Sequence, residues 1–169
     1  MSAASEDVQP RVIGAPGTML LGVGGYIDRF FTADHETTFV YTAQVDFGRF
    51  LSRHIVVGGG IAGTGSFGGN ADTLTTGPGA PATHAFGGAH WYFTPQSLAS
   101  VYAGAEYWAQ IARRDGPDAG AVLAKVGLQG ALSSRASVYL EGGYGLGLTR
   151  NDEGFPTRVV GRFGFRIKL

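Results

Sequence analysis

The stretch SVYLEGGYGLGLT, residues 137–149, decides the fold. Every second residue from Ser137 to Thr149 is small or polar, whereas the residues between them, from Val138 to Leu148, are mostly apolar. Alternate side chains of a β-strand point to opposite faces, so this stretch predicts one strand with an apolar face and a polar face. The same alternation recurs about eight times along the chain, and such repetition is typical of a closed transmembrane β-barrel.

The segments that carry this alternation are 18–31, 38–51, 55–66, 83–93, 98–112, 121–132, 136–149 and 158–169. Each is long enough to cross a bilayer, which a tilted strand does with about 9 to 11 residues. Short connections (52–54, 94–97 and 133–135) alternate with longer ones (33–37, 67–82, 113–120 and 150–157). Outer-membrane barrels have short periplasmic turns and longer extracellular loops, so both termini are expected to face the periplasm. The predicted fold is all-β: an eight-stranded antiparallel up-and-down transmembrane β-barrel.

Composition narrows the functional classes. Charged residues make up 15% of the 169-residue chain and its net charge is zero, whereas a usual charged share is about a quarter. Scattered basic residues without a net positive charge argue against a nucleic-acid partner. Cysteine is absent, which excludes disulfides, thiol catalysis and thiolate metal sites. No run of about 18 apolar residues occurs, so a transmembrane helix is not expected.

Residues 1–16 differ from the rest of the chain. They include Glu6, Asp7 and two prolines and lack the apolar core of an intact secretory signal peptide. We therefore expect a periplasmic N-terminal leader segment at 1–16, with the signal peptide already removed, and one transmembrane barrel at 17–169.

Two barrel architectures use amphipathic strands of this kind. In a membrane barrel the apolar face of each strand points outward, and in a soluble ligand carrier of the lipocalin type it points inward. The polar face here is mostly Gly, Ser, Tyr and Gln, whereas a water-facing surface would be crowded with charged residues. Glycines at inward positions also suit a narrow lumen. The membrane barrel is therefore favoured over the soluble carrier.

Aromatic residues near strand ends support the membrane barrel, because Trp, Tyr and Phe prefer the two bilayer interfaces. The residues expected in the periplasmic belt are Phe47, Phe50, Trp91, Phe93 and Phe165, and those in the outer belt are Phe31, Phe39, Tyr41, Tyr107 and Tyr144.

Charged residues also occur on the predicted inward face: Asp28, Asp46, Glu106, Lys125, Glu141, Arg162 and Arg166. Four of them, from Glu106 to Arg162, alternate in sign over the last four strands at a middle depth, which predicts a ladder of ion pairs. The interior of an eight-stranded barrel is just wide enough to be filled by side chains. This network is interpreted as a plug of mutually neutralised charges; the alternative is a gate whose pairs exchange to open a narrow ion path.

No motif indicates catalysis. The histidines, His35, His54, His84 and His90, show no arrangement with a neighbouring serine, and no nucleophile elbow is present. His84 and His90 share the lumen face and are expected to be structural. Glycine runs such as GGGIAGTG lie inside predicted strands, where no helix follows to form a phosphate site. No enzyme activity, cofactor or metal site is predicted.

The chain resembles the small outer-membrane β-barrel family of Gram-negative bacteria and is similar to the eight-stranded OmpA-type transmembrane domain. The resemblance rests on PGTMLLGVGGYI, FLSRHIVVGGGIAG, YFTPQSLASVYAGAEY, LSSRASVYLEGGYGLG and VVGRFGFRIKL. Members of this family often end in an aromatic residue that the barrel-assembly machinery reads. Here the chain ends in Leu169, and the resemblance implies an assembly signal made of Phe163, Phe165, Ile167 and Leu169.

These observations predict a non-enzymatic protein of the bacterial outer membrane with a structural or surface-interaction role. Its expected partners are the lipid bilayer, the assembly machinery during insertion, and an extracellular partner bound by loop 67–82. A narrow channel is the first alternative, and a soluble carrier is the second.

Overall fold

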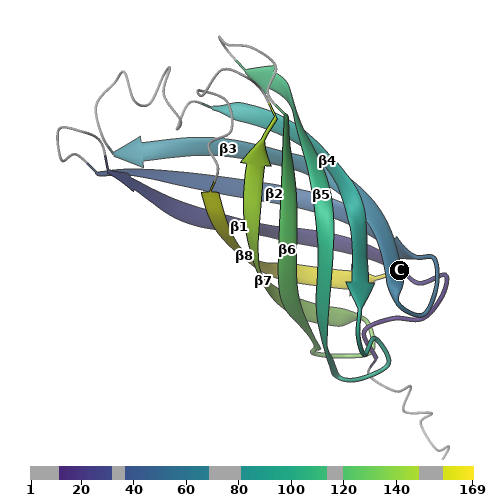
Figure 1. The fold of residues 1–169 in the computed structure, drawn as a ribbon. Helices are drawn as coiled ribbons and strands as arrows, with labels where there is room; N and C mark the ends of the chain where they lie inside the picture. The colour runs from purple at the N-terminus through teal and green to yellow at the C-terminus, as the bar shows by residue number, and fades with distance from the viewer. Residues whose placement is uncertain (1–11, 32–36, 69–80, 114–119, 149–157) are drawn as a thin grey trace, which may run out of the picture.

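The protein folds as a closed barrel of eight antiparallel strands in chain order (Figure 1). The computed structural model describes residues 12–31, 37–68, 81–113, 120–148 and 158–169, with side chains at 27–31, 37–38, 66, 68, 112–113 and 158–160 not described. The strands are β1 (Met19–Phe31), β2 (Thr37–Phe50), β3 (Ile55–Gly68), β4 (Ala82–Tyr92), β5 (Ala99–Arg113), β6 (Gly120–Ala131), β7 (Ala136–Gly147) and β8 (Arg158–Lys168). The predicted all-β, eight-stranded antiparallel up-and-down barrel is confirmed, and every strand end lies within two residues of its predicted position.

Two of the short turns use the same side-chain device. In the turn between β2 and β3, the Ser52 hydroxyl oxygen accepts hydrogen bonds from the backbone amides of His54, at 3.3 Å, and Ile55, at 3.1 Å. Between β6 and β7, Ser133 accepts from the amides of Arg135, at 3.2 Å, and Ala136, at 2.9 Å. A serine that bonds to backbone two and three residues onward stabilises a tight reversal. The predicted long loops lie mostly outside the described residues.

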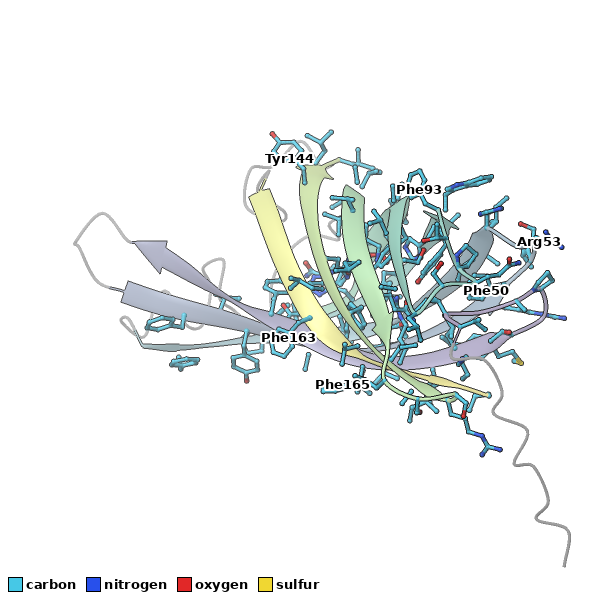
Figure 2. All side chains as sticks on the ribbon, turned by 90° about the horizontal axis from the view of Figure 1, so that it is seen from below. Phe50, Arg53, Phe93, Tyr144, Phe163 and Phe165 are labelled. Carbon is cyan, nitrogen blue, oxygen red and sulfur yellow. The ribbon has the colours of Figure 1, made fainter. Side chains whose placement is uncertain are left out.

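The outer face of the barrel is apolar. Outward side chains such as Leu140 (65% exposed), Phe163 (63%) and Ile61 (58%) lie on several strands, and Figure 2 shows Phe163 and Phe165 projecting from the outside of β8. This is the opposite of a lipocalin-type carrier, whose apolar side chains line the interior. Among the described residues there is no helix with the length and hydrophobicity to cross a membrane.

Among the belt residues whose side chains the structure describes, Phe50 lies on the inner face and not in the predicted belt, and the side chain of Phe31 lies outside the described residues. Phe50 is 1% exposed and packs inside the barrel against Tyr92, with 5.3 Å between ring centroids. It follows the inward parity of Asp46 and Gly48 on β2, so strand alternation overrides the tendency of aromatic residues to lie at an interface.

The residues that precede β1 close the end of the barrel that carries the short turns. Ile13 is 1% exposed and belongs to an inner apolar cluster with Leu20, Phe50, Val56, Tyr92 and Tyr102. The amide of Gly14 donates to the carbonyl of Pro95 at 3.1 Å, and Gly17, with φ of 89°, donates to the carbonyl of Phe50 at 2.8 Å. The segment at 12–17 is therefore held across this mouth of the barrel.

Glycines inside the barrel make room for large side chains from neighbouring strands. A Cβ atom on Gly24 or Gly164 would overlap the hydroxyl of Tyr139, and a Cβ on Gly127 would overlap the ring of Tyr102. The lumen is thus packed by aromatic residues that lie over bare backbone.

This packing predicts that Gly24→Leu is destabilising. Overpacking a filled interior costs about 1 to 3 kcal/mol, so we expect a lower midpoint of urea unfolding in phospholipid vesicles. Gly130→Leu is the matched control, because a Cβ at Gly130 has no neighbouring atom within 4 Å. Equal midpoints for the two variants would contradict the tight packing around Tyr139.

Candidate functional site: the charged lumen

The barrel interior contains six of the seven charged residues that the sequence placed there. Asp46 on β2, Glu106 on β5, Lys125 on β6, Glu141 on β7, and Arg162 and Arg166 on β8 are all at most 8% exposed. The seventh, Asp28, lies on β1, and its side chain is outside the described residues. Three carboxylates therefore face three cationic groups within one lumen.

Four of these side chains form a ring of alternating charge. The Glu106 carboxylate pairs with the Lys125 ammonium and, at 2.9 Å, with Nη2 of Arg162. The Glu141 carboxylate pairs with the same two cations, at 3.1 Å to Lys125 Nζ and 2.6 Å to Arg162 Nε. Each ion in the ring thus contacts two ions of opposite sign, which offsets the desolvation that burial imposes on all four.

The strand register places these residues together. Glu141 and Arg162 are direct cross-strand partners between β7 and β8. Lys125 lies opposite Gly104 on β5 and Gly143 on β7, so its side chain has glycine on both sides and can reach carboxylates on either neighbouring strand. Diagonal neighbours on one face of a sheet are within reach of long side chains.

Arg166 forms a second polar centre, nearer the short turns. Its guanidinium donates to the Tyr92 hydroxyl at 3.1 Å and to Gln129 Oε1 at 3.0 Å, and its Nε lies 3.4 Å from Asp46 Oδ1. The same group stacks over the Tyr139 ring at 4.2 Å. Arg166 therefore reaches from β8 across the lumen to β2 and β4.

Further polar side chains contact the members of the ring. Trp108 Nε1 donates to Glu106 Oε2 at 3.0 Å, and the Tyr102 hydroxyl donates to Glu141 Oε2 at 2.6 Å. Arg162 Nη1 donates to Gln44 Oε1 at 3.0 Å, which links β8 to β2. His90 Nε2 lies 3.3 Å from Glu106 Oε1, so this histidine belongs to the network.

Apolar layers lie on both sides of the charges. Toward the long loops, Tyr26, Ala62, Phe86, Trp108, Ala121 and Leu123 form one buried cluster. Toward the short turns lies the cluster that contains Ile13. Between them a cavity of about 20 Å³ borders Asp46, His90, Glu106 and Arg166, which is room for about one water molecule.

The histidines lie apart from one another in the part of the chain that the structure describes, and so do the residues of the predicted assembly signal. No group of three or more His, Cys, Asp or Glu side chains there could hold a metal ion. His54 lies in a turn, stacked on Trp91 at 5.1 Å, His84 and His90 lie on the lumen face of β4, and His35 falls outside the described residues. Phe163, Phe165, Ile167 and Leu169 all point outward, and their role in assembly stays a prediction.

Five polar residues of the lumen network were not predicted as site residues from the sequence: Gln44, Tyr92, Tyr102, Gln129 and Tyr139. Ile13, which closes one end of the barrel, was not predicted either. The five polar ones occupy inward positions of their strands, so the same parity that found the charges would have found them. Ile13 precedes the first strand, and no periodic signal marks it.

Known proteins of similar structure are barrels, and their sequence identity to this chain is low. No protein-family description matches the chain, and no curated protein matches it either. Among solved structures it is similar to a de novo designed transmembrane β-barrel, with 14% identity, a TM-score of 0.46, and coverage of 92% of this chain and 98% of the designed one. The outer-membrane protein OmpT of Vibrio cholerae shows 18% identity and a TM-score of 0.33, covering 89% of this chain. The chain spans about half the length of OmpT, 52%.

The ring predicts strong coupling between its members. Glu106→Gln leaves two buried cations with one carboxylate between them, and breaking a buried pair costs about 3 to 5 kcal/mol. Adding Lys125→Met restores neutrality, because one carboxylate, Glu141, then pairs with one cation, Arg162. The double variant is therefore expected to lose less unfolding free energy than the two single variants lose in sum, by at least about 1 kcal/mol. The measurement is urea unfolding in phospholipid vesicles.

The control for this cycle is Arg135→Gln, which removes an exposed charge in a turn and is expected to leave stability nearly unchanged. Strict additivity of Glu106→Gln and Lys125→Met would contradict the ring.

Proposed function

We propose that this chain is an integral protein of the bacterial outer membrane whose lumen is closed by its own side chains. Its role is structural or surface-interacting, without catalysis. The observation that carries this proposal is the neutral ring of Glu106, Lys125, Glu141 and Arg162, which is enclosed by a barrel whose outward side chains are apolar. Such an inverted arrangement is stable where the surrounding solvent is lipid.

The contents of the lumen support closure. An eight-stranded barrel encloses little more space than its inward side chains fill. The path along the axis meets the Ile13 cluster, the two charged centres and the Trp108 cluster in turn. A hydrated ion needs a continuous water-filled path along the lumen. A cavity of about 20 Å³ beside Asp46 is too small to form such a path.

The surface role rests on the topology. Loops on a rigid scaffold commonly carry recognition, and the longest connection, loop 67–82, leaves the end of the barrel opposite the short turns. Most of this loop lies outside the described residues. We propose that an extracellular partner binds there, and that the assembly machinery reads the apolar face of β8 during insertion.

A narrow channel is the second candidate, and one observation favours it. Asp46 Oδ2 is buried without a hydrogen-bond partner among the described residues, and it borders the small cavity on the glycine-rich side of the lumen formed by β2 and β3. Exchange of Arg166 between carboxylates could enlarge this cavity into an ion path.

Conductance across a planar lipid bilayer distinguishes the two candidates. We expect the wild-type barrel to be silent, because its lumen charges neutralise one another in place. A variant in which Glu106, Lys125, Glu141 and Arg162 are all replaced by Ser should also be silent, because the Ile13 and Trp108 clusters still close the lumen on both sides of the emptied middle. A mobility shift between boiled and unboiled samples on a detergent gel verifies that each protein has folded.

The channel candidate makes the opposite prediction for the wild type. Reproducible unit steps from the wild-type barrel, with a size that changes in Glu141→Ala, would contradict the plugged lumen.

A further inference from the structure

The seam that closes the barrel is paired over only part of its length. The ladder between β1 and β8 ends at the pair of Gly25 and Phe163. Beyond it, among the described residues, 27–31 of β1 are paired with β2 alone and 158–161 of β8 with β7 alone. The end of β1 lies well away from the start of β8 in both views (Figures 1 and 2). Two strand edges are therefore left open on the side of the long loops.

Large inward side chains fill the lumen beside these open edges. Within the ladder, the last inward pair is Gly24 and Gly164. The next inward positions are Tyr26 on β1 and Arg162 on β8, which are 7% and 2% exposed. Tyr26 belongs to the Trp108 cluster, and the guanidinium of Arg162 lies over the Trp108 ring at 5.4 Å. Glycines thus let the two strands meet in the lower part of the seam, whereas bulky contents keep them apart above it.

Open strand edges are costly in lipid. A tilted strand crosses a bilayer with about 9 to 11 residues, and the ladder covers only Leu20 to Gly25 of β1, so the open edges begin within the bilayer. Backbone N–H and C=O groups there find no water, and leaving them without partners is strongly destabilising. Each edge belongs to a regular strand held on its other side, so each is a template for a further strand.

A second copy of this chain offers strands of the required direction. β1 and β8 pair antiparallel in the lower part of the seam. Two copies inserted in the same direction are related by a twofold axis along the membrane normal. Such an axis preserves strand direction, so β1 of one copy meets β8 of the other antiparallel, and the contact occurs twice. The two edges are also similar in length, 27–31 and 158–161.

We propose that the chain forms this twofold dimer in the membrane, with 27–31 of each protomer paired to 158–161 of its partner. All four open edges are then covered, and the bulky contents of each lumen stay in place. The inference rests on the proposed membrane location, because in water the same backbone groups would be solvated.

Disulfide formation between introduced cysteines tests the dimer, since the chain has no cysteine of its own. Ile27→Cys and Gly161→Cys are made as separate proteins, refolded together into phospholipid vesicles and oxidised with copper phenanthroline. If the register of the ladder continues across the dimer, positions 27 and 161 face each other. We therefore expect a disulfide-linked dimer on a non-reducing gel.

The matched control is a mixture of Val23→Cys and Phe165→Cys. These two positions face each other within one chain and are both exposed on the outer face, so their mixture should give at least about fivefold less dimer. Gly161→Cys should fold normally, because a Cβ at Gly161 has no neighbouring atom within 4 Å.

Three results would overturn the dimer. The first is an equal yield of dimer from the two mixtures, and the second is as much dimer from Ile27→Cys or Gly161→Cys alone as from their mixture. The third is a monomeric disulfide only in a chain that carries both substitutions, because the seam then closes on itself. Flotation of the vesicles reports insertion separately. Loss of flotation would contradict the membrane location as well, whereas flotation without a cross-link would contradict the dimer alone.

Discussion

Ion pairing among Glu106, Lys125, Glu141 and Arg162 is the interaction on which the interior depends. Four charged groups lie within a narrow lumen, and each is out of contact with bulk water. An isolated buried charge is strongly destabilising, whereas alternating neighbours satisfy one another. The ring spans β5 to β8, and Arg162 extends it to β2 through Gln44. Arg166, in the second polar centre, contacts Asp46 on β2. Opposite walls of the barrel are therefore joined through polar contacts in its centre.

Large and small inward residues alternate around the barrel. Tyr102 on β5 lies over Gly127 on β6, and Tyr139 on β7 lies over Gly164 on β8 and Gly24 on β1. These rings occupy the space because the glycines have no side chains that compete for it. Filling a narrow barrel with large and small residues on neighbouring strands leaves little room for a solute. The outer face of the barrel, in contrast, consists mainly of exposed apolar side chains.

Strand alternation made most of this architecture predictable. The period of two in residues 137–149, repeated along the chain, predicts strand number, strand bounds and the face of each inward charge. It does not give distances across the lumen, so the exact partners of Arg166 could not be read from it. The prediction for Phe50 is wrong because its inward parity on β2 outweighs the preference of aromatic residues for an interface. Ile13 lies before the first strand, where the alternation of polar and apolar residues has not begun. The partial pairing of β1 with β8 depends on how the barrel closes, and no local sequence pattern indicates it.

The central claim is that polar groups face inward and apolar groups face lipid, and the two tryptophans test it most directly. Trp91 is 48% exposed on the outer face, and Trp108 is 6% exposed beside Glu106. Refolding Trp108→Phe and Trp91→Phe separately into vesicles of lipid brominated on its acyl chains leaves one emitting indole in each protein. The structure predicts strong quenching of Trp91 and little quenching of Trp108. Equal quenching of both, or stronger quenching of Trp108, would contradict the orientation of β4 and β5 and with it the central claim.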